Sequence, residues 1–132
     1  MYERKAGMAI VLLVDDDADL IDACGMVIAQ RGHKIKAAHS AEEARLILKS
    51  CKPDVIVLDV MMETKTAGFD LSREIHQQFP NLPIIMLTSI HQAVQPPYRF
   101  EPDETWLPVV KFIDKPADPV ALADEIDAAL AK

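Results

Sequence analysis

Short apolar runs alternate along the chain with segments in which apolar residues recur every three or four positions. The runs are rich in valine, isoleucine and leucine, which is the pattern of strands buried on both faces of a parallel sheet. They cover residues 9–14, 34–39, 54–58, 83–87 and 109–113, and the second of them is the least apolar. The segments between them have the spacing of amphipathic helices. This alternation predicts an α/β fold with helices on both faces of the sheet.

Local signals predict where several of these helices begin and end. Ser40 followed by Glu43 matches a capping box. Asp118 before Pro119 combines an N-cap with a proline at the first helical position. Gly32 follows an apolar helical face and predicts a C-terminal cap. The prediction of these helices therefore rests on capping signals at their ends as well as on their apolar faces.

One segment breaks the alternation. Residues 88–108 lie where a fourth helix is expected, but they contain prolines at positions 96, 97, 102 and 108. Proline inside a helix removes a backbone donor and disfavours helix in the residue before it. We therefore predict that this helix is degenerate or replaced by a proline-rich loop. Such a loop is either a functional segment or a surface insertion with no role.

Polar residues of complementary chemistry follow four of the predicted strands. Asp15, Asp16 and Asp17 follow the first strand, Asp59 the third, Thr88 the fourth and Lys115 the fifth. Because the carboxyl ends of parallel strands meet at one edge of a sheet, these side chains are expected to lie together. Clustered carboxylates repel one another and favour a bound cation, and Mg²⁺ prefers oxygen ligands. The acidic run taken alone is also explained by a solvated loop in which an aspartate caps the next helix.

Size and composition restrict the class of protein. The 132 residues are enough for one domain with a core, and a chain that is 50% hydrophobic is not expected to be disordered. The net charge of −7 disfavours nucleic acid or an anionic membrane as a direct partner. The apolar run at residues 8–14 is too short to span a membrane. Cys24 and Cys51 fall in predicted helices without the spacing of metal ligands, so we expect buried free thiols in a reducing, cytoplasmic compartment.

Four motifs at the predicted strand ends carry a family resemblance. They are VDDD at residues 14–17, VLDVM at 57–61, MLTS at 86–89 and FIDKP at 112–116. From residue 9 to residue 132 the chain resembles a response-regulator receiver domain of two-component signalling, in particular the stand-alone single-domain type. The resemblance implies a flavodoxin-like, doubly wound sheet of five parallel strands in the order 2-1-3-4-5. The chain is then one receiver domain over residues 1–132, with 1–7 as an N-terminal tail and 88–108 as an atypical loop.

By this resemblance Asp59 is the phosphoacceptor, which takes a phosphoryl group from a sensor histidine kinase or a phosphotransfer protein. The ligands of Mg²⁺ would be Asp15, Asp16, Asp59 and the backbone carbonyl of Met61. The residue in contact with the phosphoryl group would be Lys115, and the switch residues would be Thr88 and Phe112. The switch would alter binding to a separate downstream protein. A receiver catalyses only its own phosphorylation and dephosphorylation, so we expect no enzyme that acts on other substrates.

Two other functions are compatible with the sequence. A haloacid-dehalogenase-like phosphatase also uses strand-end aspartates, a threonine and a lysine; its nucleophile would be Asp15, with Asp17 as acid and base, and Asp59 would have no role. A pseudo-receiver would use the same fold as a protein-binding module without phosphorylation. Phosphate incorporation that depends on Asp59 indicates a receiver, incorporation that depends on Asp15 indicates a phosphatase, and no incorporation indicates a pseudo-receiver.

Overall fold

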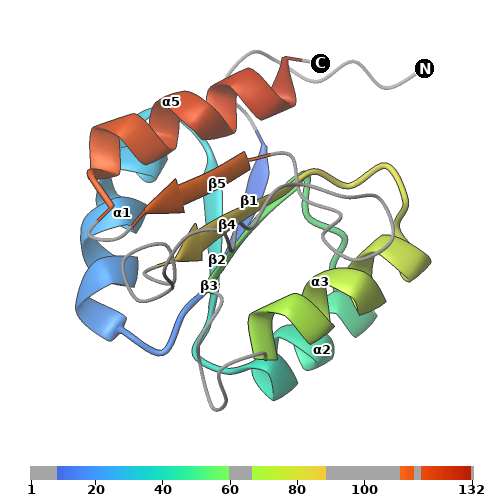
Figure 1. The fold of residues 1–132 in the computed structure, drawn as a ribbon. Helices are drawn as coiled ribbons and strands as arrows, with labels where there is room; N and C mark the ends of the chain where they lie inside the picture. The colour runs from blue at the N-terminus through green and yellow to red at the C-terminus, as the bar shows by residue number, and fades with distance from the viewer. Residues whose placement is uncertain (1–8, 60–66, 89–110, 115–116, 132) are drawn as a thin grey trace, which may run out of the picture.

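The computed structural model describes residues 9–59, 67–88, 111–114 and 117–131. Within these residues, five parallel strands form one sheet with the order β2-β1-β3-β4-β5 (Figure 1). The strands are β1 (Ile10–Val14), β2 (Lys34–Ala38), β3 (Val55–Asp59), β4 (Ile84–Thr88) and β5 (Lys111–Asp114). The flavodoxin-like sheet and the strand order expected from the sequence are therefore confirmed.

Four helices in the described part of the chain cover both faces of this sheet. They are α1 (Ala18–Gln30), α2 (Ala41–Ser50), α3 (Ala67–Gln78) and α5 (Pro119–Leu130). Helices α1 and α5 lie on one face, and α2 and α3 lie on the other (Figure 1). None of these four helices is both long enough and apolar enough to cross a membrane.

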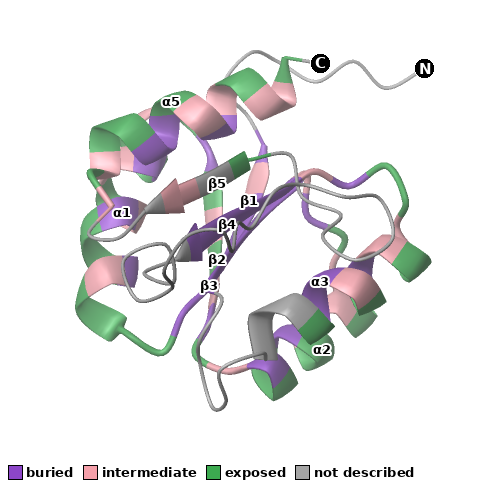
Figure 2. Cartoon of the chain, in the orientation of Figure 1, coloured by how far each residue is buried: buried purple, intermediate pink, exposed green. Residues whose placement is uncertain are grey.

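The sheet divides the hydrophobic core into two clusters, because successive side chains of a strand point to opposite faces. In β3, Ile56 and Leu58 pack in the cluster beneath α2 and α3, whereas Val55 and Val57 pack in the cluster beneath α1 and α5. All four are almost fully buried. Figure 2 shows the same arrangement, with buried residues along the central strands β1, β3 and β4 and exposed residues on the outer sides of the helices. The most apolar runs of the sequence thus correspond to the central strands β1, β3 and β4, which are buried on both faces.

The expected helix ends are present in the structure. The Ser40 hydroxyl accepts a hydrogen bond from the backbone N–H of Glu43 at 3.1 Å at the start of α2. The Asp118 carboxylate accepts one from the N–H of Ala121 at 3.2 Å at the start of α5. Each bond satisfies an amide that has no partner inside the helix. The first turn of each helix is therefore fixed where the sequence predicted it.

The predicted third strand is shifted by one residue relative to β3. Asp54 was expected inside the strand, but it lies just before it, and its carboxylate accepts a hydrogen bond from the backbone N–H of Ile10 at 2.8 Å. Asp59, expected to follow the strand, is its last residue. A carboxylate in place of a strand pairing satisfies the first amide of β1. The Asp54 backbone N–H donates in turn to the Ile10 carbonyl at 2.8 Å, so one side-chain and one backbone hydrogen bond join the two strands at this point.

The two cysteines differ in their surroundings, and both are free thiols. Cys24 lies in α1 and is buried, as expected. Burial raises the pKa of its thiol above the ordinary value, and the negative charges of Asp15 and Asp118 raise it further. The prediction for Cys51 was wrong: it follows α2 as an extended C-cap residue and is only partly buried. Its extended backbone ends the helix there.

A charged clamp joins the end of α1 to α5. The Arg31 guanidinium lies 2.7 Å from the Asp127 carboxylate and 2.8 Å from that of Asp124. The ring Nε2 of the buried His33 lies 2.8 Å from the other oxygen of Asp127. Partial burial raises the pKa of Asp127, but hydrogen bonds from His33 and Arg31 outweigh it and hold the pKa below its ordinary value. The carboxylate of Asp127 is therefore held in its charged form.

The predicted proline-rich replacement of the fourth helix falls almost entirely on residues 89–110, which lie outside the described residues. The first residue of that segment, Thr88, is the last residue of β4. The N-terminal tail at 1–7 is also outside the described part of the chain. Both expectations stay predictions.

Gly25 lies in the middle of α1, where glycine is less favourable than alanine. A Cβ at this position would meet Ile35 at 3.8 Å and Leu13 at 3.9 Å, which are ordinary van der Waals contacts. We expect Gly25→Ala to raise the free energy of unfolding by up to about 1 kcal/mol in urea titrations. Gly32→Ala is the matched control, because Gly32 has a φ of 92° that favours glycine, and it should destabilise. Changes of the same sign would contradict this reasoning.

Candidate functional site

Three aspartate carboxylates meet at the carboxyl edge of the sheet. Asp15, Asp16 and Asp59 each offer an oxygen, and these three oxygens all lie within 4.8 Å of one another. Asp15 and Asp59 are 1% and 4% exposed, whereas Asp16 is exposed. The carboxylates of Asp15 and Asp59 are therefore buried, and that of Asp16 faces solvent.

The strands determine where the two buried carboxylates lie. Asp15 directly follows β1, and its backbone N–H donates to the carbonyl of Ala38 at 3.0 Å, so pairing with β2 extends one residue beyond the strand. Asp59 is the last residue of β3 and pairs in register with Leu87 of β4. Because β1 and β3 are neighbours, their carboxyl ends place the two side chains together. The spacing of the cluster is a consequence of the strand order.

The third acidic residue of the run has a different environment. Asp17 is the N-cap of α1, and its carboxylate accepts hydrogen bonds from the backbone N–H groups of Asp19 at 3.1 Å and Leu20 at 3.2 Å. Its own backbone N–H donates to the Asp15 carboxylate at 2.9 Å. Both explanations of the acidic run therefore apply, to different residues. Two aspartates join the cluster, and one caps the helix.

The chemistry of the cluster fits a hard divalent cation. Three carboxylates this close repel one another, so a cation between them removes an unfavourable interaction. An octahedral Mg²⁺ holds oxygen ligands about 3–4 Å apart, as its metal–oxygen distance of about 2.0–2.1 Å requires. The three carboxylate oxygens lie within 4.8 Å of one another, which is close to that spacing. The donor set and its geometry are compatible with Mg²⁺ bound at this edge.

The remaining predicted site residues are placed only in part. Thr88 ends β4 and pairs with Asp114 of β5, so its backbone lies at the same edge as Asp59. Phe112 lies in β5 and pairs in register with Met86 of β4. Two other predicted residues, Met61 and Lys115, lie outside the described residues. Their roles stay predictions.

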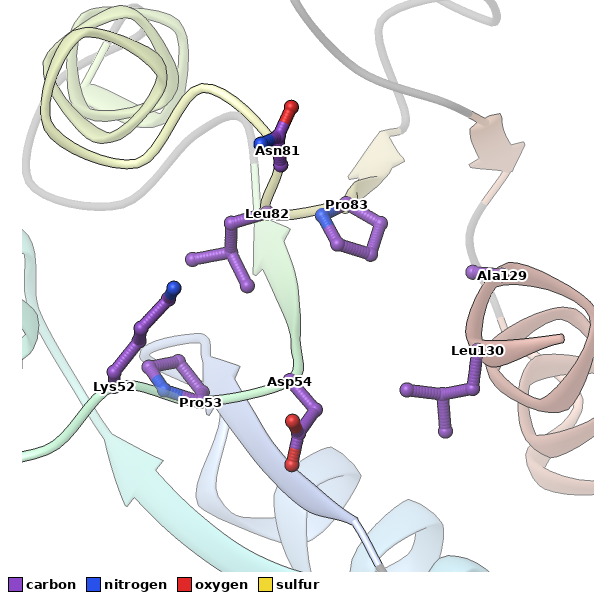
Figure 3. Close-up of a pocket in the computed structure, with 8 residues that line it drawn as sticks. All are labelled: Lys52, Pro53, Asp54, Asn81, Leu82, Pro83, Ala129 and Leu130. Carbon is purple, nitrogen blue, oxygen red and sulfur yellow. The ribbon is translucent and has the colours of Figure 1, made fainter. Parts of the chain in front are cut away.

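A pocket of about 220 Å³ lies at the other end of the sheet (Figure 3). It is lined by the residues that lead into β3 and β4, including Asp54 and Pro83, and by Leu130 at the end of α5. None of the clustered aspartates lines it. The aspartate cluster and this pocket therefore lie at opposite edges of the sheet.

Comparison with known proteins agrees with this arrangement. Residues 11–127 match the family model of the response regulator receiver domain. The response regulator SaeR of Staphylococcus aureus is 30% identical over 125 residues, which is 95% of this chain and 52% of SaeR. The chain thus spans about half the length of this curated relative.

Solved structures show the same fold. The receiver domain of NtrX from Brucella abortus is 26% identical, with a TM-score of 0.76 over 92% of this chain and 98% of that one. The chemotaxis response regulator CheY4 of Vibrio cholerae is 25% identical, with a TM-score of 0.75 over 93% of this chain and 99% of that one. This chain itself has the strand order β2-β1-β3-β4-β5 and an aspartate cluster at the carboxyl edge of the sheet. The chain belongs to the response-regulator receiver-domain family.

Proposed function

We propose that this protein is a phosphoacceptor that takes a phosphoryl group onto Asp59 in the presence of Mg²⁺. The observation that carries the proposal is the meeting of Asp15, Asp16 and Asp59 within 4.8 Å at the carboxyl edge of the sheet. A single strand-end aspartate is common in α/β proteins. A buried aspartate beside two further carboxylates has the surroundings that a charged nucleophile and a cation require.

Asp59 supplies the nucleophile. One of its carboxylate oxygens forms a bond to the phosphorus of a phosphohistidine, and the phosphorus–nitrogen bond breaks with its electron pair going to the imidazole, which then takes a proton from water. The position of Asp59 at the end of β3 holds its carboxylate in place, and its burial keeps water from competing. Bound Mg²⁺ supplies neutralising positive charge to the carboxylate and to the transferring oxygens.

Asp15 and Asp16 serve as metal ligands in this proposal. Asp15 is already oriented before the metal binds, because strand pairing fixes its backbone and the Asp17 N–H fixes its carboxylate. Asp16 is exposed and can adjust to complete the site. The family resemblance adds the Met61 carbonyl as a ligand and Lys115 as a cation for the phosphoryl oxygens. The protein then promotes the transfer by positioning the reacting groups and by stabilising their charge, as is usual in phosphoryl transfer.

The expected partners follow from this chemistry. The donor is a sensor histidine kinase or a phosphotransfer protein, which places the protein in the cytoplasm. The receiver catalyses only its own phosphorylation and dephosphorylation. After transfer, the added oxygens attract Thr88, and a shift of Thr88 and Phe112 changes the surface offered to a downstream protein.

The geometry gives less support to the two alternatives. In a haloacid-dehalogenase-like phosphatase, Asp17 would act as acid and base, but its carboxylate accepts two hydrogen bonds from the first turn of α1. That assignment would also leave the buried Asp59 without a role. A pseudo-receiver has no need of three carboxylates within 4.8 Å of one another, which lower stability unless a cation binds.

The proposal is tested with acetyl phosphate, a small phosphodonor that bypasses the kinase. We expect the intact mass of the protein to rise by one phosphoryl group in millimolar Mg²⁺ and to stay unchanged when a chelator removes the metal. An unchanged mass under both conditions would indicate a pseudo-receiver. A mass gain of equal extent with the chelator would contradict the metal requirement.

A further inference from the structure

Asp17 connects the candidate metal site to α1 through two sets of hydrogen bonds. Its carboxylate accepts from the N–H groups of Asp19 and Leu20, and its carbonyl accepts from the N–H of Ile21 at 3.1 Å. Its backbone N–H points the other way and donates to the Asp15 carboxylate at 2.9 Å. One residue thus holds the start of a helix and a buried carboxylate at the same time.

The helix that Asp17 caps is itself held firmly. Ile21, Cys24 and Ile28 of α1 are buried against the sheet. A cap fixes the first turn of a helix, since it satisfies amides that otherwise have no partner. With the cap in place, the Asp17 N–H has a fixed position relative to β1, and so does the carboxylate of Asp15 that accepts from it.

Loss of the cap has a specific consequence for the carboxylates. The first turn of α1 can then fray, and the Asp17 N–H no longer fixes the orientation of the Asp15 carboxylate. Asp16 lies between these two residues in the chain, so its direction changes with them. A metal site with misaligned ligands binds its ion more weakly, even when every ligand is still present.

We infer that Asp17 is a positioning residue of the metal site, which acts through the cap of α1 and not as a ligand or as a negative charge. The inference rests on the proposed Mg²⁺ site at Asp15, Asp16 and Asp59. It assigns the third acidic residue of the run a function that its neighbours do not share. The exposed Asp17 side chain can be replaced without disturbing the core.

Three substitutions at Asp17 separate the cap from the charge. Asp17→Asn keeps the cap and removes the charge, because asparagine caps helices as well as aspartate. Asp17→Glu keeps the charge, but its longer side chain fits the cap geometry poorly. Asp17→Ala removes both. The dissociation constant for Mg²⁺ is measured for each variant by calorimetric titration with MgCl₂, and the same protein is melted with and without Mg²⁺.

We expect Asp17→Ala and Asp17→Glu to weaken Mg²⁺ binding by about tenfold, as is typical when a group that orients a metal ligand is lost. Asp17→Asn should stay close to the parent. Ser40→Ala is the matched control, since it removes a comparable N-cap from α2, and its dissociation constant should equal that of the parent.

Each other outcome overturns a defined statement. Equal Mg²⁺ binding by Asp17→Ala and the parent refutes the positioning role. Weak binding by Asp17→Asn with normal binding by Asp17→Glu shows that the charge matters and refutes it as well. Weakening by Ser40→Ala to the same extent shows that any lost cap has this effect. If the parent itself binds no Mg²⁺, the proposed metal site is wrong, and the inference falls with it.

Discussion

Replacing Asp59 by asparagine is expected to abolish the Mg²⁺-dependent gain of a phosphoryl group. The carboxylate oxygen is the nucleophile, and the neutral amide oxygen cannot take its place. Asparagine has the same shape, so the side chain still fits the buried position at the end of β3. Intact-mass measurement after incubation with acetyl phosphate and Mg²⁺ should show the unmodified mass only.

The control for this substitution is Asp22→Asn, which changes an exposed aspartate of α1 in the same chemical way and should leave phosphorylation intact. Thermal melts without Mg²⁺ show whether the loss has a structural cause. Asp59→Asn should melt at the parent's temperature or above it, because it removes one of three mutually repelling charges. Phosphorylation of Asp59→Asn at the parent's level would place the acceptor elsewhere.

Replacing Leu122 by alanine is expected to cost about 2–5 kcal/mol of the free energy of unfolding. Leu122 of α5 is 0% exposed and packs in the cluster that includes Val57 of β3 and Leu87 of β4. Truncation loses buried apolar surface and leaves a cavity that the rigid sheet cannot close. Because domains of this kind have about 5–15 kcal/mol in total, the urea midpoint should fall markedly.

Val120→Ala is the matched control for the buried leucine. Val120 lies on the same helix two positions earlier and is 50% exposed. Its truncation removes little buried surface and replaces a β-branched residue with a better helix former, so the midpoint should stay or rise slightly. Equal losses from the two substitutions would contradict the assignment of the Leu122 effect to its burial in the core.

Much of the fold is predictable from local sequence because its signals are local. The apolar run at 55–58 identifies a strand buried on both faces, and Ser40 and Asp118 identify helix starts through bonds that span only three residues. Strand ends were less predictable, since the bond from Ile10 to the Asp54 carboxylate joins residues far apart in sequence. No local pattern shows that an aspartate satisfies the amide of a different strand.

The acidic composition of the candidate site was predictable from the sequence pattern, but the separate role of each aspartate was not. Three aspartates in a row show that an acidic site is possible, and the strand context indicates which edge of the sheet holds it. Composition alone does not show which of the three lies apart from the cluster, because Asp15, Asp16 and Asp17 have the same side chain; the family resemblance named Asp15 and Asp16 as the ligands. The local signal for Asp17 is its place before the helical pattern, where an aspartate is a good cap. The division of roles depends on backbone directions that only the folded chain determines.

The clamp of Arg31, His33 and Asp127 fixes the C-terminal part of α5 relative to the end of α1. A slide of α5 along α1 would break the charge-assisted hydrogen bonds that Arg31 and His33 make with Asp127, so the clamp opposes such a movement. The lowered pKa of Asp127 means that this contribution to stability is complete above the ordinary value of 3.8 and is lost only as the pH falls through the lower folded value. At neutral and mildly acidic pH the clamp therefore holds the C-terminal part of α5 against the end of α1.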